Sequence, residues 1–219
     1  MLDLFLRLFH TLFPLTQDKL LNFIQYAGPI KFQVLLCVIL FCETGLVVTP
    51  FLPGDSLLFA VGAIGVGSAI FNLPVLTVCL LGAVLLGDNT NYWIGRSLGP
   101  AVFHYEKSKL FNKKYLLKAH SFYETYGAKT IILARFVPIV RTFAPFVAGV
   151  GTMNYAKFFV FSLLGAIAWV TICVGAGSLL GNVDFVKKHF EVVALVIVFI
   201  SIIPMGIEAW KHRKPRPAA

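Results

Sequence analysis

The amino-acid sequence predicts an all-α integral membrane protein, and three observations lead to this fold class. Of the 219 residues, 58% are hydrophobic and only 13% are charged, whereas about 25% charged residues is typical of a soluble domain. The mean hydropathy of the chain is +0.83. The apolar residues also gather in runs of about 20, which is the length that a helix needs to cross a bilayer.

Four apolar segments are long enough to cross the membrane as helices. They are residues 28–48, 73–95, 155–180 and 192–210. The second segment ends in Tyr92 and Trp93, and aromatic residues of this kind are typical of the membrane–water interface. We therefore expect four full spans, with Tyr92 and Trp93 as interface anchors.

One further apolar stretch, residues 56–67, is too short to span. It holds about 12 residues, which is the length expected of a re-entrant segment. Pro50 and the pair Pro53-Gly54 come directly before it, and proline and glycine interrupt helical geometry. The sequence predicts a half-helix that begins at Ser56, with Asp55 as a candidate cap.

A second stretch, residues 130–151, is apolar but interrupted. Pro138 and Pro145 both lie within it, so we expect a broken or re-entrant helix. Phe51-Leu52-Pro53 opens the first broken segment and Phe136-Val137-Pro138 opens the second. Each is followed by an apolar run dotted with Gly and Ala and then by a spanning helix, which indicates an internal repeat.

Charge in the loops predicts the topology. Residues 96–129 and the tail 211–219 are strongly basic, and basic loops stay in the cytoplasm. The connection 67–74 carries no charge and is expected outside. Four spans then leave both termini in the cytoplasm, and the two broken segments enter from opposite faces, as in the inverted repeats of secondary transporters. Residues 1–27 are expected to form an interfacial helix and linker before a membrane domain at 28–210.

The formal net charge of +9 would raise nucleic acid as a partner if the protein were soluble. Basic membrane loops explain the charge more simply, and the sequence holds no RNA-binding signature and no zinc-finger spacing. The four cysteines all lie in apolar runs without a CxxC pair. We expect no nucleic-acid partner, no metal and no cofactor, and no catalytic motif of an enzyme is present.

Ionisable residues at membrane depth are expensive and usually functional. The first half contributes Glu43 and Asp55, and the second half contributes Arg135 and Arg141. If the broken segments meet, two carboxylates face two guanidiniums. Arginine matches phosphate with a bidentate fork, so this would be an anion site beside groups that can carry a proton. The alternative is that these charges are ion pairs that only hold the segments together; for Asp88 a structural role and a functional role are equally well supported.

Three motifs are recognisable in the sequence. They are residues 51–55 (FLPGD), 87–96 (GDNTNYWIGR) and 135–141 (RFVPIVR), with Ala148-Gly149 following. Together they resemble the bacterial DedA family, whose members share the VTT (SNARE-associated) domain. The stretches 41–57 and 129–149 match that family most closely.

The resemblance implies an inner-membrane protein with two opposed re-entrant segments, linked to the proton motive force and to envelope homeostasis. Members of the family recycle undecaprenyl phosphate, the lipid carrier of cell-wall synthesis. The family's essential acidic pair matches Glu43 and Asp55, and its arginine pair matches Arg135 and Arg141. The remaining motif residues that we expect to support the site are Pro53, Gly54, Asp88, Tyr92 and Pro138.

The function expected from both arguments is transport of a lipid phosphate, coupled to protons, by a protein that is not an enzyme. The partners are then a polyprenyl phosphate and protons or cations, and a homo-oligomer is an open alternative to a single chain. Two other functions remain open. One is a proton-coupled cation or drug antiporter that uses the carboxylates, and the other is a general phospholipid scramblase.

Overall fold

A computed structural model of the protein describes residues 22, 24–46, 54–66, 71–104, 127–181, 183 and 193, without the side chains of residues 99–104, 138 and 139. Every regular element in these residues is a helix, which confirms the all-α prediction for this part of the chain. The helices are α3 (Pro29–Gly45), α4 (Gly54–Gly65), α5 (Leu73–His104), α7 (Lys129–Ala134), α8 (Pro138–Val150) and α9 (Tyr155–Leu180).

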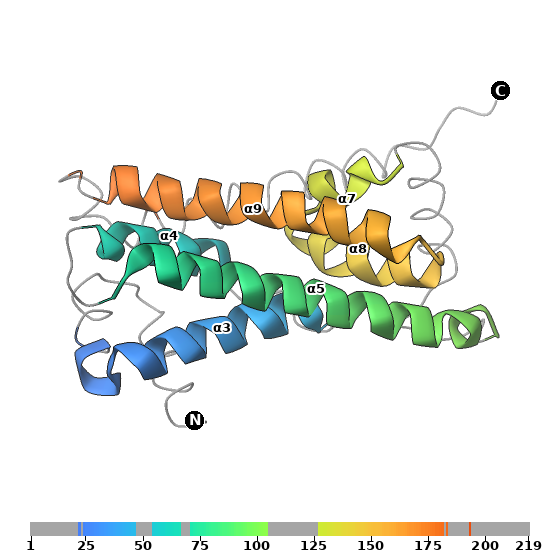
Figure 1. Ribbon diagram of the computed structural model, residues 1–219, viewed down its shortest axis with the longest axis horizontal. Helices are drawn as coiled ribbons and strands as arrows, with labels where there is room; N and C mark the ends of the chain where they lie inside the picture. The colour runs from blue at the N-terminus through green and yellow to red at the C-terminus, as the bar shows by residue number, and fades with distance from the viewer. Residues whose placement is uncertain are drawn as a thin grey trace, which may run out of the picture.

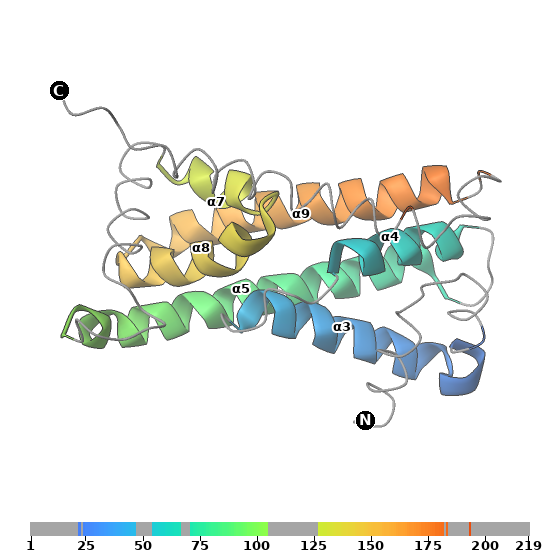
Figure 2. The same cartoon turned by 180° about the vertical axis from the view of Figure 1, so that it is seen from behind.

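Two long helices extend through the molecule, and the shorter helices pack against them (Figure 1). Helices α5 and α9 run side by side along the whole molecule, with α3 and α4 at one end and α7 and α8 at the other, and the reverse view in Figure 2 agrees. Helix α5 packs mainly against α8 and α3, while α9 packs mainly against α4 and to a smaller extent against α5 and α7. The short helix of each half therefore lies on the long helix of the other half.

The two long helices have the length and composition of membrane spans. The apolar parts are Leu73–Leu98 and Tyr155–Leu180, 26 residues each. At 1.5 Å per residue each is about 39 Å long, against about 30 Å for the hydrocarbon core of a bilayer. Two of the four predicted spans are thus confirmed as long apolar helices, and the predicted span 28–48 is the 17-residue helix α3.

Other predicted segments lie largely or wholly outside the described residues. These are the interfacial helix at 1–27, of which only 22 and 24–27 are described, the span 192–210, Pro53 and the tail 211–219. The structure describes part of the predicted loop 96–129 and shows that its first residues belong to a helix. Helix α5 continues to His104, because Arg96 ends the apolar run without ending the helix, since arginine is a good helix former.

Both broken segments appear as short helices. Helix α4 has 12 residues and begins at Gly54, two residues before the predicted start at Ser56. In the second half the chain is interrupted between Ala134 and Pro138, and Val137 is extended (φ −117°, ψ 109°), as is usual for a residue before proline. The predicted interruption at Pro145 is wrong, because Pro145 lies inside α8. Broken backbone hydrogen bonds of this kind are tolerated in membrane helices that pack against neighbours.

The outer surface of the bundle is apolar. On α3 the exposed residues Ile30, Val34 and Val38 follow one another at four-residue spacing, so they form one stripe of the helix. The opposite side of α3, with Leu36 and Leu40, is buried in the main hydrophobic core. Large exposed apolar surfaces are rare on soluble proteins, so this surface fits acyl chains and agrees with the membrane prediction.

Glycines set the crossing of α4 and α9. A β-carbon on Gly62 of α4 would lie 2.1 Å from the carbonyl oxygen of Val174, and one on Gly177 of α9 would lie 2.1 Å from the carbonyl oxygen of Phe59. Both glycines therefore allow the two backbones to touch directly, as small residues do in membrane helix pairs.

The crossing of α5 and α8 has the same construction. A β-carbon on Gly95 of α5 would lie 2.1 Å from the carbonyl oxygen of Phe146, and one on Gly149 of α8 would lie 2.0 Å from that of Tyr92. In both crossings each helix supplies one glycine and one facing carbonyl, three residues apart. The repeat indicated by the sequence is therefore present in the way the two halves pack.

Candidate functional site

Arg141, in the first turn of α8, is bound by one carboxylate from each of two other helices. Its Nη1 donates to Oδ1 of Asp55 at 2.7 Å, and its Nη2 donates to Oε1 of Glu43. Glu43 lies near the end of α3 and Asp55 is the second residue of α4. Glu43 is fully buried and Arg141 is 7% exposed. The ends of both broken segments thus meet around a single guanidinium.

Trp169 of α9 completes this site. Its Nε1 donates to Oδ1 of Asp55 at 2.8 Å, and the Cζ atom of Arg141 lies 4.7 Å from the centre of its rings. At this distance a guanidinium is attracted to the aromatic face. Four helices therefore contribute to what we name the Arg141 cluster: Glu43, Asp55, Arg141 and Trp169.

Two polar atoms in the Arg141 cluster lack partners. Within the part of the chain that the structure describes, Oε2 of Glu43 and Nε of Arg141 are buried and make no hydrogen bond. Buried polar groups are normally paired, and leaving one unpaired costs about 1–3 kcal/mol. Gly54 also donates its backbone N–H to Oε1 of Glu43 at 3.3 Å, and a β-carbon on Gly54 would lie 1.9 Å from Oε2. A side chain at position 54 would therefore push the Glu43 carboxylate out of its present position.

Arg135 lies in a second buried group. Its Nη2 donates to Oδ2 of Asp88, and Ser162 of α9 donates its hydroxyl to the same oxygen. Nη2 of Arg135 also lies 3.3 Å from the hydroxyl oxygen of Ser162. Asp88, on α5, is fully enclosed by this contact and by the surrounding helices, with 2% of its surface exposed. We name these three residues the Asp88 cluster.

The sequence prediction for the four main charges needs one correction. Arg141 meets Glu43 and Asp55 as expected, but Arg135 binds Asp88 instead of sharing that site. Arg135 follows the last residue of α7, whereas Arg141 lies in the first turn of α8. The break between these helices separates the two guanidiniums, so that each finds its own carboxylate.

Asn91 was not predicted as a site residue, and it connects the elements that carry the Arg141 cluster. Its Nδ2 donates to the carbonyl oxygens of Thr44 at 2.9 Å and Thr142 at 2.6 Å. These residues directly follow Glu43 and Arg141 in the chain. The run of polar residues from Asp88 to Asn91 inside an apolar helix could have indicated Asn91 as a site residue. No feature of the sequence indicated Trp169 or Ser162.

Tyr92 is not the interface anchor that the sequence predicts. It is fully buried, and its ring stacks on Phe158 with centres 4.5 Å apart. Its hydroxyl donates to the carbonyl oxygen of Met153 at 2.5 Å and accepts from Nη1 of Arg96 at 2.9 Å. Trp93, in contrast, is 49% exposed, as an anchor would be. Tyr92 instead holds the turn between α8 and α9 against α5.

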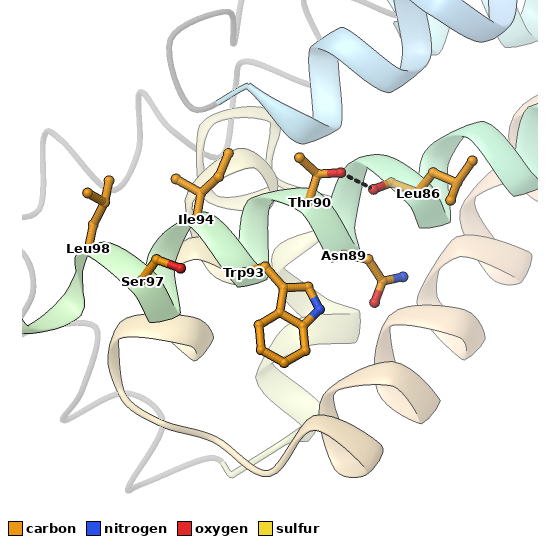
Figure 3. A pocket seen from close by; sticks show the side chains of 7 residues that line it. All are labelled: Leu86, Asn89, Thr90, Trp93, Ile94, Ser97 and Leu98. Atoms are coloured by element: carbon orange, nitrogen blue, oxygen red, sulfur yellow. Dashed lines mark hydrogen bonds between the residues drawn. The ribbon is translucent and has the colours of Figure 1, made fainter.

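A shallow groove of about 620 Å³ follows the outer side of α5 (Figure 3). Its lining residues are Leu86, Asn89, Thr90, Trp93, Ile94, Ser97 and Leu98. The polar groups are largely satisfied locally; for example, the hydroxyl of Thr90 donates to the carbonyl oxygen of Leu86 at 2.8 Å. No residue of either charged cluster lines it, so it belongs to the outer surface of the bundle. Among the described residues, no group of three or more His, Cys, Asp or Glu side chains has the arrangement of a metal site.

Comparison with known proteins identifies the family of the chain. Residues 50–179 match the model of the VTT domain. Protein DedA of Escherichia coli K12 is 49% identical over 181 residues, covering 82% of this chain and 83% of the relative. The uncharacterized membrane protein Rv0364 of Mycobacterium tuberculosis is 46% identical over 182 residues, covering 83% of this chain and 80% of the relative.

A more distant relative is the inner membrane protein YghB of Salmonella typhimurium. It is 31% identical over 189 residues, covering 85% of this chain and 84% of the relative. No solved structure matches the chain. The matched region contains Asp55, Asp88, Arg135 and Arg141, and the family model spans more than half of the sequence. The chain therefore belongs to the DedA family of VTT-domain membrane proteins and is close to DedA.

Proposed function

We propose that this protein carries a lipid phosphate across the bacterial inner membrane, with a polyprenyl phosphate such as undecaprenyl phosphate as the substrate, and that protons are coupled to the movement. The observation that carries the proposal is the buried guanidinium of Arg141, held where the helices α4 and α8 of the two broken segments begin. The location follows from relatives that are named as inner membrane proteins.

The phosphate group is the reason for preferring a lipid phosphate over a neutral lipid. A guanidinium binds phosphate through two parallel hydrogen bonds. Helices α4 and α8 both begin near Arg141, and the unpaired N–H groups of a helix start favour anions. Breaks in backbone at membrane depth are tolerated where they are buried or line a cavity, so an anion path through these breaks is physically reasonable.

The carboxylates supply the proton part of the proposal. Glu43 and Asp55 are the direct partners of Arg141, so their protonation changes the charge that surrounds the phosphate-binding group. Ionisable side chains inside membrane proteins commonly serve as proton relays. Coupling in this proposal means that Glu43, Asp55 or both gain and lose a proton in each transport cycle.

Alternating access requires the two halves to enter the membrane from opposite faces. The proposal therefore has both termini in the cytoplasm and an inverted arrangement of the broken segments. Cysteines placed singly at positions 72 and 112 of a cysteine-free protein test this. Reagents that do not cross membranes should label position 72 from outside and position 112 from the cytoplasm. Labelling of both from the same side contradicts the inverted arrangement.

An antiporter for a cation or a cationic drug is the second candidate. The observation that favours it is that the Arg141 cluster holds two carboxylates and one guanidinium, so that it is acidic overall. It gives no substrate role to Arg141, the guanidinium that both carboxylates bind. A general scramblase differs from both the phosphate transporter and the antiporter, because it moves lipids regardless of their headgroup.

Reconstitution distinguishes these functions. Liposomes containing the purified protein are loaded with labelled undecaprenyl phosphate, undecaprenol or phosphatidylethanolamine, and the exchange of each lipid between leaflets is measured. The proposal predicts that the phosphate is exchanged and that undecaprenol is not. Equal exchange of all three lipids supports the scramblase, and a pH change driven by a cation gradient without lipid exchange supports the antiporter.

A further inference from the structure

Both terminal nitrogens of the Arg141 guanidinium are already bound to carboxylates. Nη1 donates to Asp55 and Nη2 donates to Glu43. The side chain of Arg141 is 5% exposed and that of Glu43 is 0% exposed, so a phosphate group can reach these two nitrogens only by displacing a carboxylate. Nε is unpaired in the described part of the chain, but alone it gives a single hydrogen bond.

We infer that binding is an exchange, in which the phosphate takes the place of Glu43 on Arg141 and the released carboxylate takes up a proton. This inference rests on the proposed function, and it specifies how that function is coupled. Proton and phosphate then enter the site together, so the protein is a symporter of the two. Glu43 occupies the place of the phosphate when the site is empty.

Charge conservation gives the stoichiometry. Glu43, Asp55 and Arg141 carry two negative charges and one positive charge, which is a net charge of −1. Adding an uncompensated charge to a buried site is expensive. The net charge stays at −1 if a phosphate monoanion enters with one proton, or a dianion enters with two. Each negative charge on the substrate is thus matched by one proton.

The contacts around Arg141 indicate that Glu43 is the carboxylate that releases the guanidinium and takes up the proton. Four packed elements face Arg141: α3 with Glu43, α4 with Asp55, α9 with Trp169 and Cys173, and α5 with Asp88 at longer range. Asp88 is held by Arg135 and Ser162. Asp55 is held by Trp169 as well as by Arg141. Glu43 has only Gly54 as a second donor, at 3.3 Å, and its Oε2 is unpaired in the described chain.

Farnesyl phosphate, a short polyprenyl phosphate, is the probe for this exchange. Its binding to the full-length protein in detergent is measured by calorimetry in two buffers with different ionisation enthalpies, which gives the affinity and the protons taken up. Farnesol, which lacks the phosphate, is the ligand control. Wild-type protein should take up about one proton for each negative charge of the probe, and its affinity should rise as the pH falls.

Two variants separate the roles of the carboxylates. Glu43→Gln removes the charge that holds Nη2, so farnesyl phosphate should bind about tenfold more tightly at neutral pH, with less proton uptake. Asp55→Asn is the matched control, because Asp55 is also held by Trp169 and is not the carboxylate that the phosphate replaces, so its gain in affinity should be smaller. An ion pair with a purely structural role predicts no gain in either variant.

The possible results keep the two proposals distinct. Wild-type binding of farnesyl phosphate without proton uptake overturns the exchange and leaves the proposed function standing, and this measurement needs no variant to fold. If the wild-type protein binds farnesyl phosphate and a folded Glu43→Gln protein binds it with equal or weaker affinity, the exchange is also overturned and the proposed function still stands. Absence of farnesyl phosphate binding at every pH, in wild type and in Glu43→Gln, overturns both.

Discussion

Asn91 donates a hydrogen bond from Nδ2 to the carbonyl oxygen of Thr142 across the contact between α5 and α8. The same nitrogen reaches the carbonyl oxygen of Thr44 at the end of α3. One fully buried amide thus fixes the two backbone positions that follow Glu43 and Arg141. The ion pair between those side chains depends on this spacing, so Asn91 is a positioning residue for the Arg141 cluster.

Replacing Asn91 with Asp tests this role. The substitution keeps the shape but removes both donated hydrogen bonds and sets a carboxylate against two carbonyl oxygens. We expect a loss of more than about 1–3 kcal/mol of stability and a melting temperature in detergent clearly below wild type. Asn89→Asp, at a half-buried position of the same helix, is the control: it loses one donated hydrogen bond, to the carbonyl oxygen of Leu85 within its own helix, and should be less destabilised than Asn91→Asp. Equal melting of the two variants contradicts the positioning role.

Lysine in place of either arginine tests phosphate recognition. Arg141→Lys and Arg135→Lys keep the charge but lose the planar fork. We expect both proteins to insert in the membrane, Arg141→Lys to lose most transport of polyprenyl phosphate, and Arg135→Lys to lose less, because Arg135 binds Asp88 outside the Arg141 cluster. Arg141→Lys should also lose binding of farnesyl phosphate, because one ammonium group cannot reproduce the paired hydrogen bonds. Full transport by both lysine variants shows that a point charge is enough and supports the ion-pair alternative.

The Asp88 cluster should behave as a structural unit in thermal unfolding. Asp88→Asn leaves the buried guanidinium of Arg135 without its counter-charge, a change that costs about 3–5 kcal/mol for a buried pair. Ser162→Ala removes a neutral donor and should cost about 1 kcal/mol. The double variant should be less destabilised than the sum, because both groups bind the same oxygen. Strict additivity of the melting shifts would show that the two contacts are independent.

Glycine-to-alanine pairs test the helix crossings. A β-carbon on Gly177 or Gly95 would lie 2.1 Å from a carbonyl oxygen of the partner helix, while one on Gly175 or Gly82 would have no neighbouring atom within 4 Å. Gly177→Ala and Gly95→Ala should separate the helices and lower the melting temperature. Gly175→Ala and Gly82→Ala should be neutral or stabilising by up to about 1 kcal/mol, because alanine favours the helix. The same melting temperature in all four variants contradicts the close crossings.

Much of the fold could be predicted because the membrane restricts it. Length and hydropathy alone locate α5 and α9, since a spanning segment has to be a long apolar helix. Proline and glycine locate the breaks before α4 and α8 for the same local reasons. The end of α5 could not be predicted in this way, because the helix outlasts its apolar run. The effect of Pro145 depends on how tightly α8 packs, which local sequence does not record.

The charged residues of the site could be predicted, but their pairing could not. A charge inside an apolar segment is visible in the sequence, so Glu43, Asp55, Arg135 and Arg141 stand out. Which carboxylate meets which guanidinium depends on the break between α7 and α8. Trp169 gives no signal, because a tryptophan in an apolar helix is ordinary until its N–H is found against Asp55.

The central claim is that a lipid phosphate and protons move together, and transport under an imposed pH gradient tests it most directly. Proteoliposomes with labelled undecaprenyl phosphate in one leaflet are given a pH step of either sign, and the rate of lipid movement is followed. The account predicts that movement toward the alkaline side is accelerated, that reversing the step reverses the effect, and that Arg141→Lys abolishes it. Lipid movement at the same rate under both gradients and without one contradicts the account.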